Sequence, residues 1–149
     1  YKLNFNDILA SIAIVQIKKI NQILNFRIKI KKYYIKKLKK IIKNKIIYIP
    51  EIKKNYISAH YNFPIIISGN KKVRNKLANF LQTKNIYTTI HYTPAHKHQF
   101  YKMKTVSKNL NNTDKLFNTT LALPFHNKLS FKDVDFISQQ ILNFFNDKR

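Results

Sequence analysis

The apolar positions over the first third of the chain have the spacing of one long helix. Asn6 suits an N-cap, and Asp7 suits a first turn, where the exposed N–H groups favour negative charge. We therefore expect a helix from near Asp7, with an apolar face formed by Ile8, Ile12, Ile20, Ile23, Ile30, Tyr34, Leu38 and Ile41. Because that length is unusual for a globular helix, the pattern also predicts a break or bend before Ile41.

Short β-type runs follow the helix. Residues 46–49 and 121–123 are predicted strands, since each apolar run ends at a proline. Residues 60–67 form a third predicted strand, in which Pro64 indicates an edge position or a bulge because proline cannot donate to a sheet ladder. Residues 87–92 are β-branched and aromatic and are predicted as a fourth strand.

Helical spacing returns between and after these strands. Residues 71–84 and 113–120 are predicted helices, and residues 94–104 are expected to form a loop with one helical turn. Ser130 and Asp133 have the spacing of a capping box ahead of a last helix, with Asp in place of the usual Glu. This order of elements predicts a two-layer α/β domain with its helices on one side of the sheet.

The net charge of +23 at pH 7 is typical of proteins that bind nucleic acid or anionic membranes. The charge is almost wholly lysine, because only Arg27, Arg74 and Arg149 are arginines. Abundant Ile, Asn, Tyr and Phe, beside one glycine and no tryptophan, indicate drift toward A/T-rich codons as the main source of the charge. A nucleic-acid-binding protein has reason to prefer arginine, which contacts phosphate and guanine in bidentate fashion.

A row of lysines on the long helix is predicted to be a solvated face rather than a phosphate-tracking surface. The row comprises Lys29, Lys32, Lys36, Lys39 and Lys43. No ribonucleoprotein motif, zinc-finger spacing or glycine-hinged helix-turn-helix is present. A basic nucleic-acid-binding domain nevertheless stays open as an alternative of a different class.

Residue types exclude several chemistries. The chain has no cysteine, so it can form neither a disulfide nor a thiolate metal site, which fits a reducing compartment. His91, His96 and His98 match no zinc-ligand spacing, and we expect no metal site. His60 and His126 are expected to be structural. The longest apolar run is too short to cross a bilayer, so no membrane insertion is expected.

Four segments, in order along the chain, resemble the C-terminal part of one enzyme family. They are Tyr1–Ile8, Arg27 with Tyr33 and Tyr34, residues 85–101, and residues 121–130. Through them the chain resembles the DegT/DnrJ/EryC1/StrS nucleotide-sugar aminotransferases, which use pyridoxal phosphate on the aspartate-aminotransferase fold. The resemblance implies the α/β small C-terminal domain of that fold, with a mainly antiparallel sheet. Residues 1–45 would be the helix leading to a large domain, and residues 46–149 the small domain.

The resemblance also implies roles for individual side chains. Lys2 and Asn4 would contact the cofactor phosphate of a neighbouring subunit, since ammonium and amide groups donate to phosphate oxygens. His91, His96 and Tyr101 would line the substrate side of the cleft. Taken without the resemblance, the opening segment is better interpreted as a ligand-free entry to the helix. The alternative for His91 is a strand-end residue bonded to a carbonyl.

Two local patterns point to one branch of the family. The opening Tyr1-Lys2-Leu3-Asn4 and the run Ala95–Tyr101 are similar to the branch that aminates UDP-4-keto-L-arabinose in lipid A modification. The resemblance to that branch implies a cytoplasmic homodimer that makes the 4-amino sugar. Glutamate would be the amino donor and 2-oxoglutarate the keto acid formed from it. Another nucleotide-sugar aminotransferase of the family is the alternative.

The chain begins at Tyr1 without a methionine, and this abrupt start predicts that a segment precedes it. In the family that it resembles, the lysine that forms the Schiff base with pyridoxal phosphate lies in the large N-terminal domain. The chain is therefore expected not to transaminate alone. A fragment, one part of a split reading frame and the remnant of a decayed gene all remain open.

Overall fold

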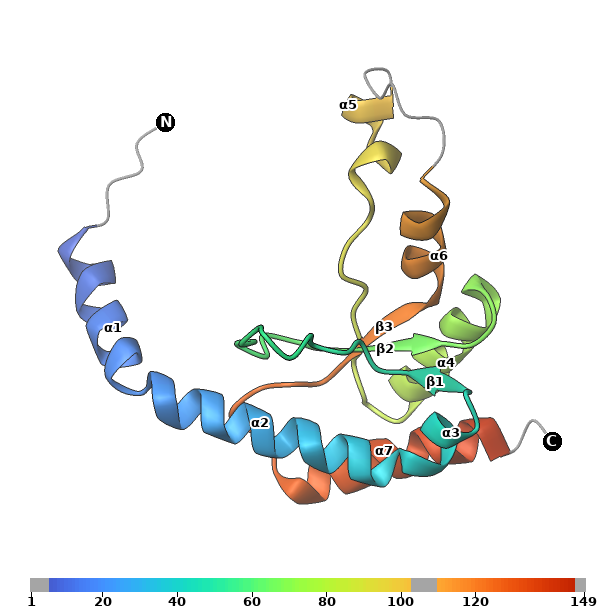
Figure 1. The fold of residues 1–149 in the computed structure, drawn as a ribbon, viewed down its shortest axis with the longest axis horizontal. Helices are drawn as coiled ribbons and strands as arrows, with labels where there is room; N and C mark the ends of the chain where they lie inside the picture. Colours follow the sequence, from blue (N-terminus) through green and yellow to red (C-terminus); the bar gives the residue numbers. More distant parts are fainter. Residues whose placement is uncertain (1–5, 103–109, 147–149) are drawn as a thin grey trace.

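A computed structural model describes residues 6–102 and 110–146 of the chain (Figure 1). Lys2 and Asn4 lie outside these residues. The helices are α1 (Asp7–Lys18), α2 (Ile20–Lys37), α3 (Lys39–Lys43), α4 (Lys71–Thr83), α5 (Gln99–Lys102), α6 (Asn111–Thr119) and α7 (Phe131–Asn146), with the 3₁₀ turn η1 (Ala95–Lys97). The strands are β1 (Ile47–Tyr48), β2 (Phe63–Ile67) and β3 (Thr120–Leu123).

The N-terminal helix begins where the sequence predicts and is interrupted twice. Asn6 caps it, because the Asn6 Oδ1 accepts a hydrogen bond from the Leu9 N–H at 2.9 Å. Lys19 and Leu38, with ψ of 0° and 5°, depart from helical geometry and divide the run into α1, α2 and α3. The break predicted before Ile41 is thus confirmed.

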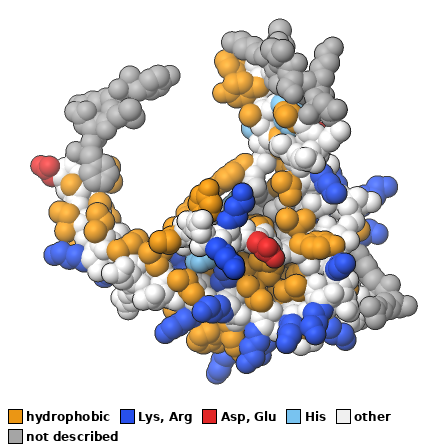
Figure 2. Space-filling model, in the orientation of Figure 1, with side chains coloured by type: hydrophobic (Ala, Val, Ile, Leu, Met, Phe, Trp, Pro, Cys, Tyr) orange, Lys and Arg blue, Asp and Glu red, His pale blue; other side chains and the backbone are white. Residues whose placement is uncertain are grey.

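The two longer segments of this run differ in burial. α1 buries none of its residues, and Ile8 and Ile17 are 73% and 67% exposed. α2 instead buries Ile30 and Tyr34 and packs along α7. Figure 1 shows α1 leading away from the rest of the molecule, and Figure 2 shows apolar side chains along it, facing a hollow in the surface.

The three strands form an antiparallel sheet in the order β1-β2-β3. β2 is therefore the central strand, so the edge position indicated by Pro64 is wrong for the strand as a whole. Proline is tolerated because Pro64 lies in the part of β2 that β1 does not reach. β1 pairs only with Ile66 and Ile67, whereas Pro64 has a partner only in β3, at Ala122.

Residues 87–92 do not form the predicted strand. They contribute one isolated bridge, in which Thr89 N donates to Ala122 O at 3.1 Å and Ala122 N donates to Thr89 O at 2.8 Å. β-propensity expresses the fit of a side chain to a half-buried pleated surface. Tyr87 and Tyr92 are 69% and 71% exposed, so the burial that would hold a longer strand is missing.

One core lies between the sheet and the helices on one side of it. Phe63, Ile65 and Ile67 of β2 alternate into this core and meet residues of α2, α4 and α7. The Tyr34 ring stacks on Phe63 with 4.9 Å between the ring centroids. The α/β fold, with its small antiparallel sheet, is confirmed.

The ends of the elements follow local chemistry. The predicted capping box is present, because Ser130 N donates to Asp133 Oδ2 at 2.8 Å and Asp133 N donates to Ser130 Oγ at 3.1 Å. Residues 94–102 form the expected loop with short helical turns, η1 and α5. The lysine row is exposed along its whole length. Within the described residues, none of the helices is long and apolar enough to span a membrane.

At four of the residues that the structure describes, the backbone lies in the left-handed region. Gly69, between β2 and α4, has a φ of 127°, and a Cβ added there would lie 3.3 Å from Val73 Cγ2. Lys45, His60 and Asn85 have φ of 55°, 46° and 59°. β2 begins at Phe63 rather than at the predicted residue 60, and the positive φ at His60 excludes that residue from a strand, since extended backbone requires negative φ.

Candidate functional site

A cavity of about 390 Å³, lined by polar and apolar residues, lies where four segments of the chain meet; we call it the His91 cavity. α2 contributes one residue. The second segment precedes β2, the third precedes η1, and the fourth comprises the end of β3 and the residues after it. Its lining comprises Arg27, Tyr61, Asn62, Tyr87, Thr89, His91, Ala122, Leu123, Pro124, Phe125, His126 and Asn127. The short pairing between Thr89 and Ala122 positions His91 here, because it holds residues 87–91 against β3.

His91 is held at both ring nitrogens. Its Nδ1 lies 3.0 Å from Asn62 Nδ2, and its Nε2 lies 2.8 Å from Thr89 Oγ1. An amide NH₂ group only donates, so Asn62 donates to an unprotonated Nδ1 and the ring proton is on Nε2, which donates to Thr89. The ring also stacks on Tyr92, with 4.8 Å between the centroids. His91 is thus an imidazole held in one orientation by two side chains.

Arg27 supplies the guanidinium of the cavity. Its Nη1 donates to Ala59 O at 3.4 Å, a long hydrogen bond. Its Nε is buried and has no hydrogen-bond partner among the described residues. A buried unpaired donor is costly, and an anionic group is its natural acceptor. Sequence reasoning used Arg27 only as a mark of resemblance and missed Asn62 and Thr89, which no local motif distinguishes.

His96 lies in a different cluster. Its Nε2 is 3.0 Å from Asp114 Oδ1, which is also 2.8 Å from Lys97 Nζ. The Lys97 ammonium, and after it His96, hold the pKa of Asp114 below its usual value against the opposing effect of desolvation. His96 therefore ties η1 to α6, and its contacts differ from those of His91.

The same cluster contains a buried arginine. Arg74 on α4 is 1% exposed, and its Nε and Nη1 have no hydrogen-bond partner within the described part of the chain. Its guanidinium carbon lies 5.8 Å from the centroid of the Phe117 ring, and Lys97 Nζ lies 5.2 Å from that centroid. Burial lowers the pKa of Arg74. These contacts hold α6 between α4 and η1.

Tyr101, the third predicted substrate residue, is on α5 and is 49% exposed. Its ring meets Phe100 edge-on, with 5.1 Å between the centroids. His98 Nε2 is 3.2 Å from Thr93 O, so the His98 contact is with the backbone. Within residues 6–102 and 110–146, no group of three His, Cys, Asp or Glu side chains could hold a metal ion. The predicted substrate roles of His91, His96 and Tyr101 stay predictions.

Two tyrosines of the resemblance hold α2 in place. Tyr34 OH donates to Pro124 O at 3.0 Å, and burial, with a smaller effect of Asp133, raises the Tyr34 pKa above its usual value. Tyr33 OH donates to Asp135 Oδ1 at 3.0 Å, while Lys37 Nζ lies 2.6 Å from the same oxygen. Pro124 lines the His91 cavity, so Tyr34 connects the core directly to the wall of that cavity.

Known proteins share this sequence pattern and this fold. A transaminase of Campylobacter jejuni, named for UDP-4-amino-4,6-dideoxy-N-acetyl-beta-L-altrosamine, is 26% identical over 144 residues, covering 96% of this chain and 38% of that protein. The aminotransferase TlmJ of Streptoalloteichus hindustanus superposes with a TM-score of 0.86 at 24% identity, covering 97% of this chain and 38% of that one. The PLP form of the putative sugar aminotransferase Spr1654 of Streptococcus pneumoniae gives 0.85 at 24% identity, covering 99% and 37%.

The chain thus spans a little over a third of the length of these proteins. The two structural likenesses establish the fold. The sequence likeness is not limited to the four segments named above. Residues 1–142 match the DegT/DnrJ/EryC1/StrS aminotransferase family. With nearly the whole chain matched, this protein belongs to the DegT/DnrJ/EryC1/StrS aminotransferase family.

Proposed function

We propose that this chain is the C-terminal part of a pyridoxal-phosphate-dependent aminotransferase that converts a UDP-4-keto sugar to the 4-amino sugar, with glutamate as donor. The observation that carries the proposal is the family match over residues 1–142. The Campylobacter jejuni relative, whose name is that of a nucleotide-sugar transaminase, supports this class of substrate. UDP-4-keto-L-arabinose is the proposed sugar, because Lys2, Asn4 and the run Ala95–Tyr101 are similar to that branch of the family.

His91 is proposed to orient substrate rather than to exchange protons. Both of its ring nitrogens are already bonded, to Asn62 and Thr89, so the ring is held in one orientation. Arg27, with its unpaired Nε, is the natural partner for a carboxylate or phosphate oxygen of a substrate. The cavity therefore offers one cation and several neutral polar groups, which suits a polar, anionic ligand. His96 and Tyr101 are proposed to contact substrate from η1 and α5.

The residues described do not complete a cofactor site. Pyridoxal phosphate needs a lysine for its Schiff base, and that lysine must lie in a desolvated pocket to be reactive. No lysine whose side chain the structure describes in residues 6–101 and 110–146 is buried. The chemical step is accordingly assigned to the remainder of the enzyme. Lys2 and Asn4 are proposed to reach the cofactor phosphate of the neighbouring subunit in a homodimer.

An assay of the complete enzyme tests the proposal. We expect UDP-4-keto-L-arabinose and glutamate to give the 4-amino sugar and 2-oxoglutarate. His91→Ala should lower kcat/KM roughly tenfold or more, because it removes an oriented hydrogen-bonded group from the cavity. His98→Ala is the matched control, since His98 contacts only a backbone carbonyl outside that cavity.

The outcomes separate the two levels of the proposal. If no nucleotide keto sugar is aminated, the aminotransferase function is wrong. If another nucleotide sugar is aminated and UDP-4-keto-L-arabinose is not, only the proposed sugar is wrong.

For Lys2 and Asn4, alanine variants of the complete enzyme should bind pyridoxal phosphate more weakly in an absorbance titration. Unchanged cofactor affinity in both variants would remove these residues from the phosphate site.

A further inference from the structure

A small cavity of about 140 Å³ lies where α2 meets the chain between β1 and β2; we call it the Lys31–His60 cavity. Its lining comprises Lys31, Ile49, Pro50, Ile52, Ser58, His60, Asn62, Phe63 and Pro64. Asn62 also lines the His91 cavity, so the two cavities meet at this residue. A water molecule takes up ~30 Å³ of the liquid, and sites for organic molecules measure ~300–1,000 Å³. The Lys31–His60 cavity therefore has the size for a small ion rather than for a sugar or a nucleoside.

Lys31 and His60 are the basic residues of this cavity, and both are partly buried. Burial lowers the pKa of Lys31, and burial, followed by the Lys31 charge, lowers the pKa of His60. Within the described residues, neither the Lys31 ammonium nor the His60 ring has a hydrogen-bond or ion-pair partner. Two basic groups that repel each other and are partly withdrawn from water favour an anion between them, because one anion offsets both costs.

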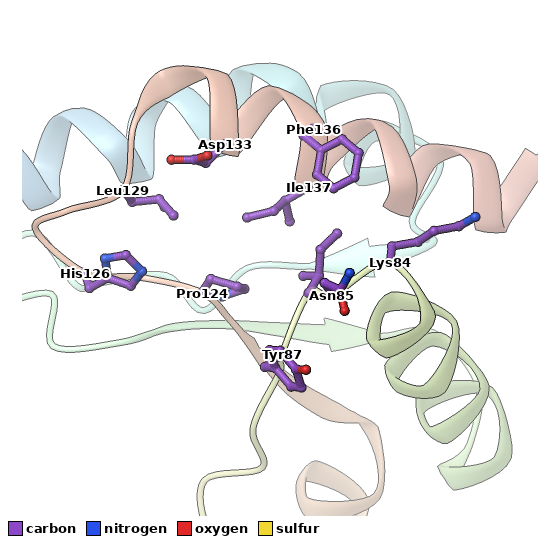
Figure 3. Close-up of a pocket in the computed structure, with 10 residues that line it drawn as sticks. Lys84, Asn85, Tyr87, Pro124, His126, Leu129, Asp133, Phe136 and Ile137 are labelled. Carbon is purple, nitrogen blue, oxygen red and sulfur yellow. The ribbon is translucent and has the colours of Figure 1, made fainter.

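Among the residues that the structure describes, no carboxylate lines the Lys31–His60 cavity or the His91 cavity. Glu51 stands between two lining residues in the sequence, but its side chain is exposed and makes no ion pair in the described residues. A larger cavity, of about 580 Å³, is different: Figure 3 shows Asp133 on its wall and the Lys84 side chain directed away from it. The positive groups at the two cavities that meet at Asn62 thus have no neutralising partner in the lining, which favours an anionic ligand.

The turn that carries His60 is fixed against α2. Ser58 Oγ accepts a hydrogen bond from His60 N at 3.1 Å, and His60 has a φ of 46°. Arg27 Nη1 donates to Ala59 O at 3.4 Å, in the middle of this turn. Lys31 follows Arg27 by one helical turn, so both side chains extend from the same face of α2. These contacts form the cavity from the chain alone, before any anion binds.

We propose that the Lys31–His60 cavity binds a small oxyanion of the phosphate or sulfate class, held by the Lys31 ammonium and the His60 ring. Lys31 supplies a charge and three donors, and a protonated His60 supplies a second charge-assisted hydrogen bond. The Ser58 hydroxyl is free to donate, because its bond to His60 N uses only an oxygen lone pair. The apolar side chains of the lining, among them Ile49 and Phe63, lower the local dielectric and strengthen these contacts.

The test is a titration of the ¹⁵N-labelled chain with sulfate at constant ionic strength, followed by heteronuclear NMR. We expect saturable shift changes at residues 31 and 58–62. Lys31→Gln should weaken sulfate binding roughly tenfold, because it removes a charge from the cavity. Lys32→Gln is the matched control, since Lys32 carries the same charge, is exposed and lies outside the cavity. Lys31→Arg keeps the charge and should keep the binding, which separates lost charge from lost packing.

The pH dependence separates the two basic groups. Sulfate keeps a constant charge near neutral pH, whereas His60, with its lowered pKa, becomes charged only as the pH falls. Sulfate should therefore bind roughly fivefold more tightly at about pH 5.5 than at about pH 8. His60→Gln should remove most of that difference, and His98→Gln, at an exposed histidine outside the cavity, should not.

Two further ligands identify the source of the anion. Free phosphate and the phosphate end of a nucleotide have the same chemistry, so both should compete with sulfate. Tighter binding of UDP than of inorganic phosphate, with the same dependence on Lys31, would assign the cavity to a nucleotide. Equal binding of the two would assign it to the free ion. Uridine, which carries no phosphate, should not compete.

Three results would overturn the inference. The first is a set of shift changes spread along the lysine row instead of at residues 31 and 58–62. The second is an equal loss of affinity in Lys31→Gln and Lys32→Gln, which would assign the binding to the net charge of the chain. The third is competition by uridine as strong as that by UDP. None of these measurements involves turnover, so their outcome is independent of the proposed aminotransferase function.

Discussion

α1 and α2 carry the same kind of apolar pattern and have opposite surroundings. Ile30 and Tyr34 of α2 are buried against the sheet and α7, whereas Ile8, Ile12 and Ile17 of α1 are 73%, 54% and 67% exposed. The periodic spacing of apolar residues follows the helical repeat of the backbone. The burial of the apolar face depends on whether another part of the protein packs against it. The difference teaches that α1 presents a contact surface with no partner among the described residues, and that α2 belongs to the core.

The largest expected effect is on the α2 side of this comparison. Tyr34→Ala should lower the free energy of unfolding by about 3–5 kcal/mol, because it opens a cavity beside Phe63 and removes the hydrogen bond to Pro124. Tyr34→Phe should cost only about 1 kcal/mol. Ile12→Ala on α1 should cost about 0.5 kcal/mol or less. Urea denaturation measures all three, and a large cost at Ile12 would mean that α1 is packed.

The second prediction concerns association. The exposed apolar face of α1 favours self-association. The chain should therefore form oligomers at micromolar concentration, as measured by light scattering. Ile12→Gln with Ile17→Gln should shift it toward the monomer, because both side chains are more than half exposed on α1. Tyr48→Gln, which changes an apolar residue on the edge strand β1, is the control. A monodisperse monomer before any substitution would contradict this view of α1.

A smaller effect is expected at the contact between α2 and α7. Lys37, followed by Tyr33, holds the pKa of Asp135 below its usual value. A depressed carboxyl pKa stabilises the fold above the pKa of the unfolded state, about 3.9, and the effect is lost as the pH falls through the folded value. Asp135→Asn should therefore be less stable than the parent at pH 7, with a gap that closes below about pH 4.

Glu51→Gln is the control for that pH dependence, because Glu51 is exposed, lies outside the helices and strands, and makes no ion pair in the described residues. Thermal unfolding from pH 2.5 to 7 gives both curves. Because the Lys37–Asp135 pair is partly exposed, salt should also narrow the gap at pH 7. A gap that persists at pH 2.5 would assign the loss to packing rather than to charge.

The smallest effect on global stability is expected at the helix start. Asn6→Ala removes the acceptor of the Leu9 N–H, a cap interaction worth about 1 kcal/mol to the helix. Since α1 adds nothing to the core, the urea midpoint should stay unchanged while amide exchange at Leu9 becomes faster. A shift of the midpoint equal to that of a core substitution would show that α1 and α2 unfold as one unit.

The elements that were predicted well are those that local chemistry determines. Asn6 and the Ser130–Asp133 box define helix starts through nearby hydrogen bonds, and the spacing of Ile30 and Tyr34 defines a buried face. Residues 87–92 were predicted wrongly because their side chains favour a strand, yet only Thr89 pairs with β3. Strand pairing depends on distant partners, which no short window of sequence reveals.

The candidate site shows the same limit. His91 could be singled out from its motif, but its partner Asn62 is 29 positions away and precedes a strand rather than a recognisable signature. Arg27 reaches the cavity from α2, far from Asn62 and His91 in the sequence. His96 and His91 are close in sequence and have different partners, because the turn at η1 directs His96 to Asp114.

The left-handed turns at Lys45, His60 and Asn85 have a consequence for protein engineering. A chain with a single glycine has had to fill these positions with residues that carry a Cβ, which resist positive φ. Each such residue stores local strain that the surrounding contacts offset. Lys45, exposed and two residues before the start of β1, is the simplest position at which to relieve this strain. The fold thus holds an unused margin of stability that a glycine there could release without altering either cavity.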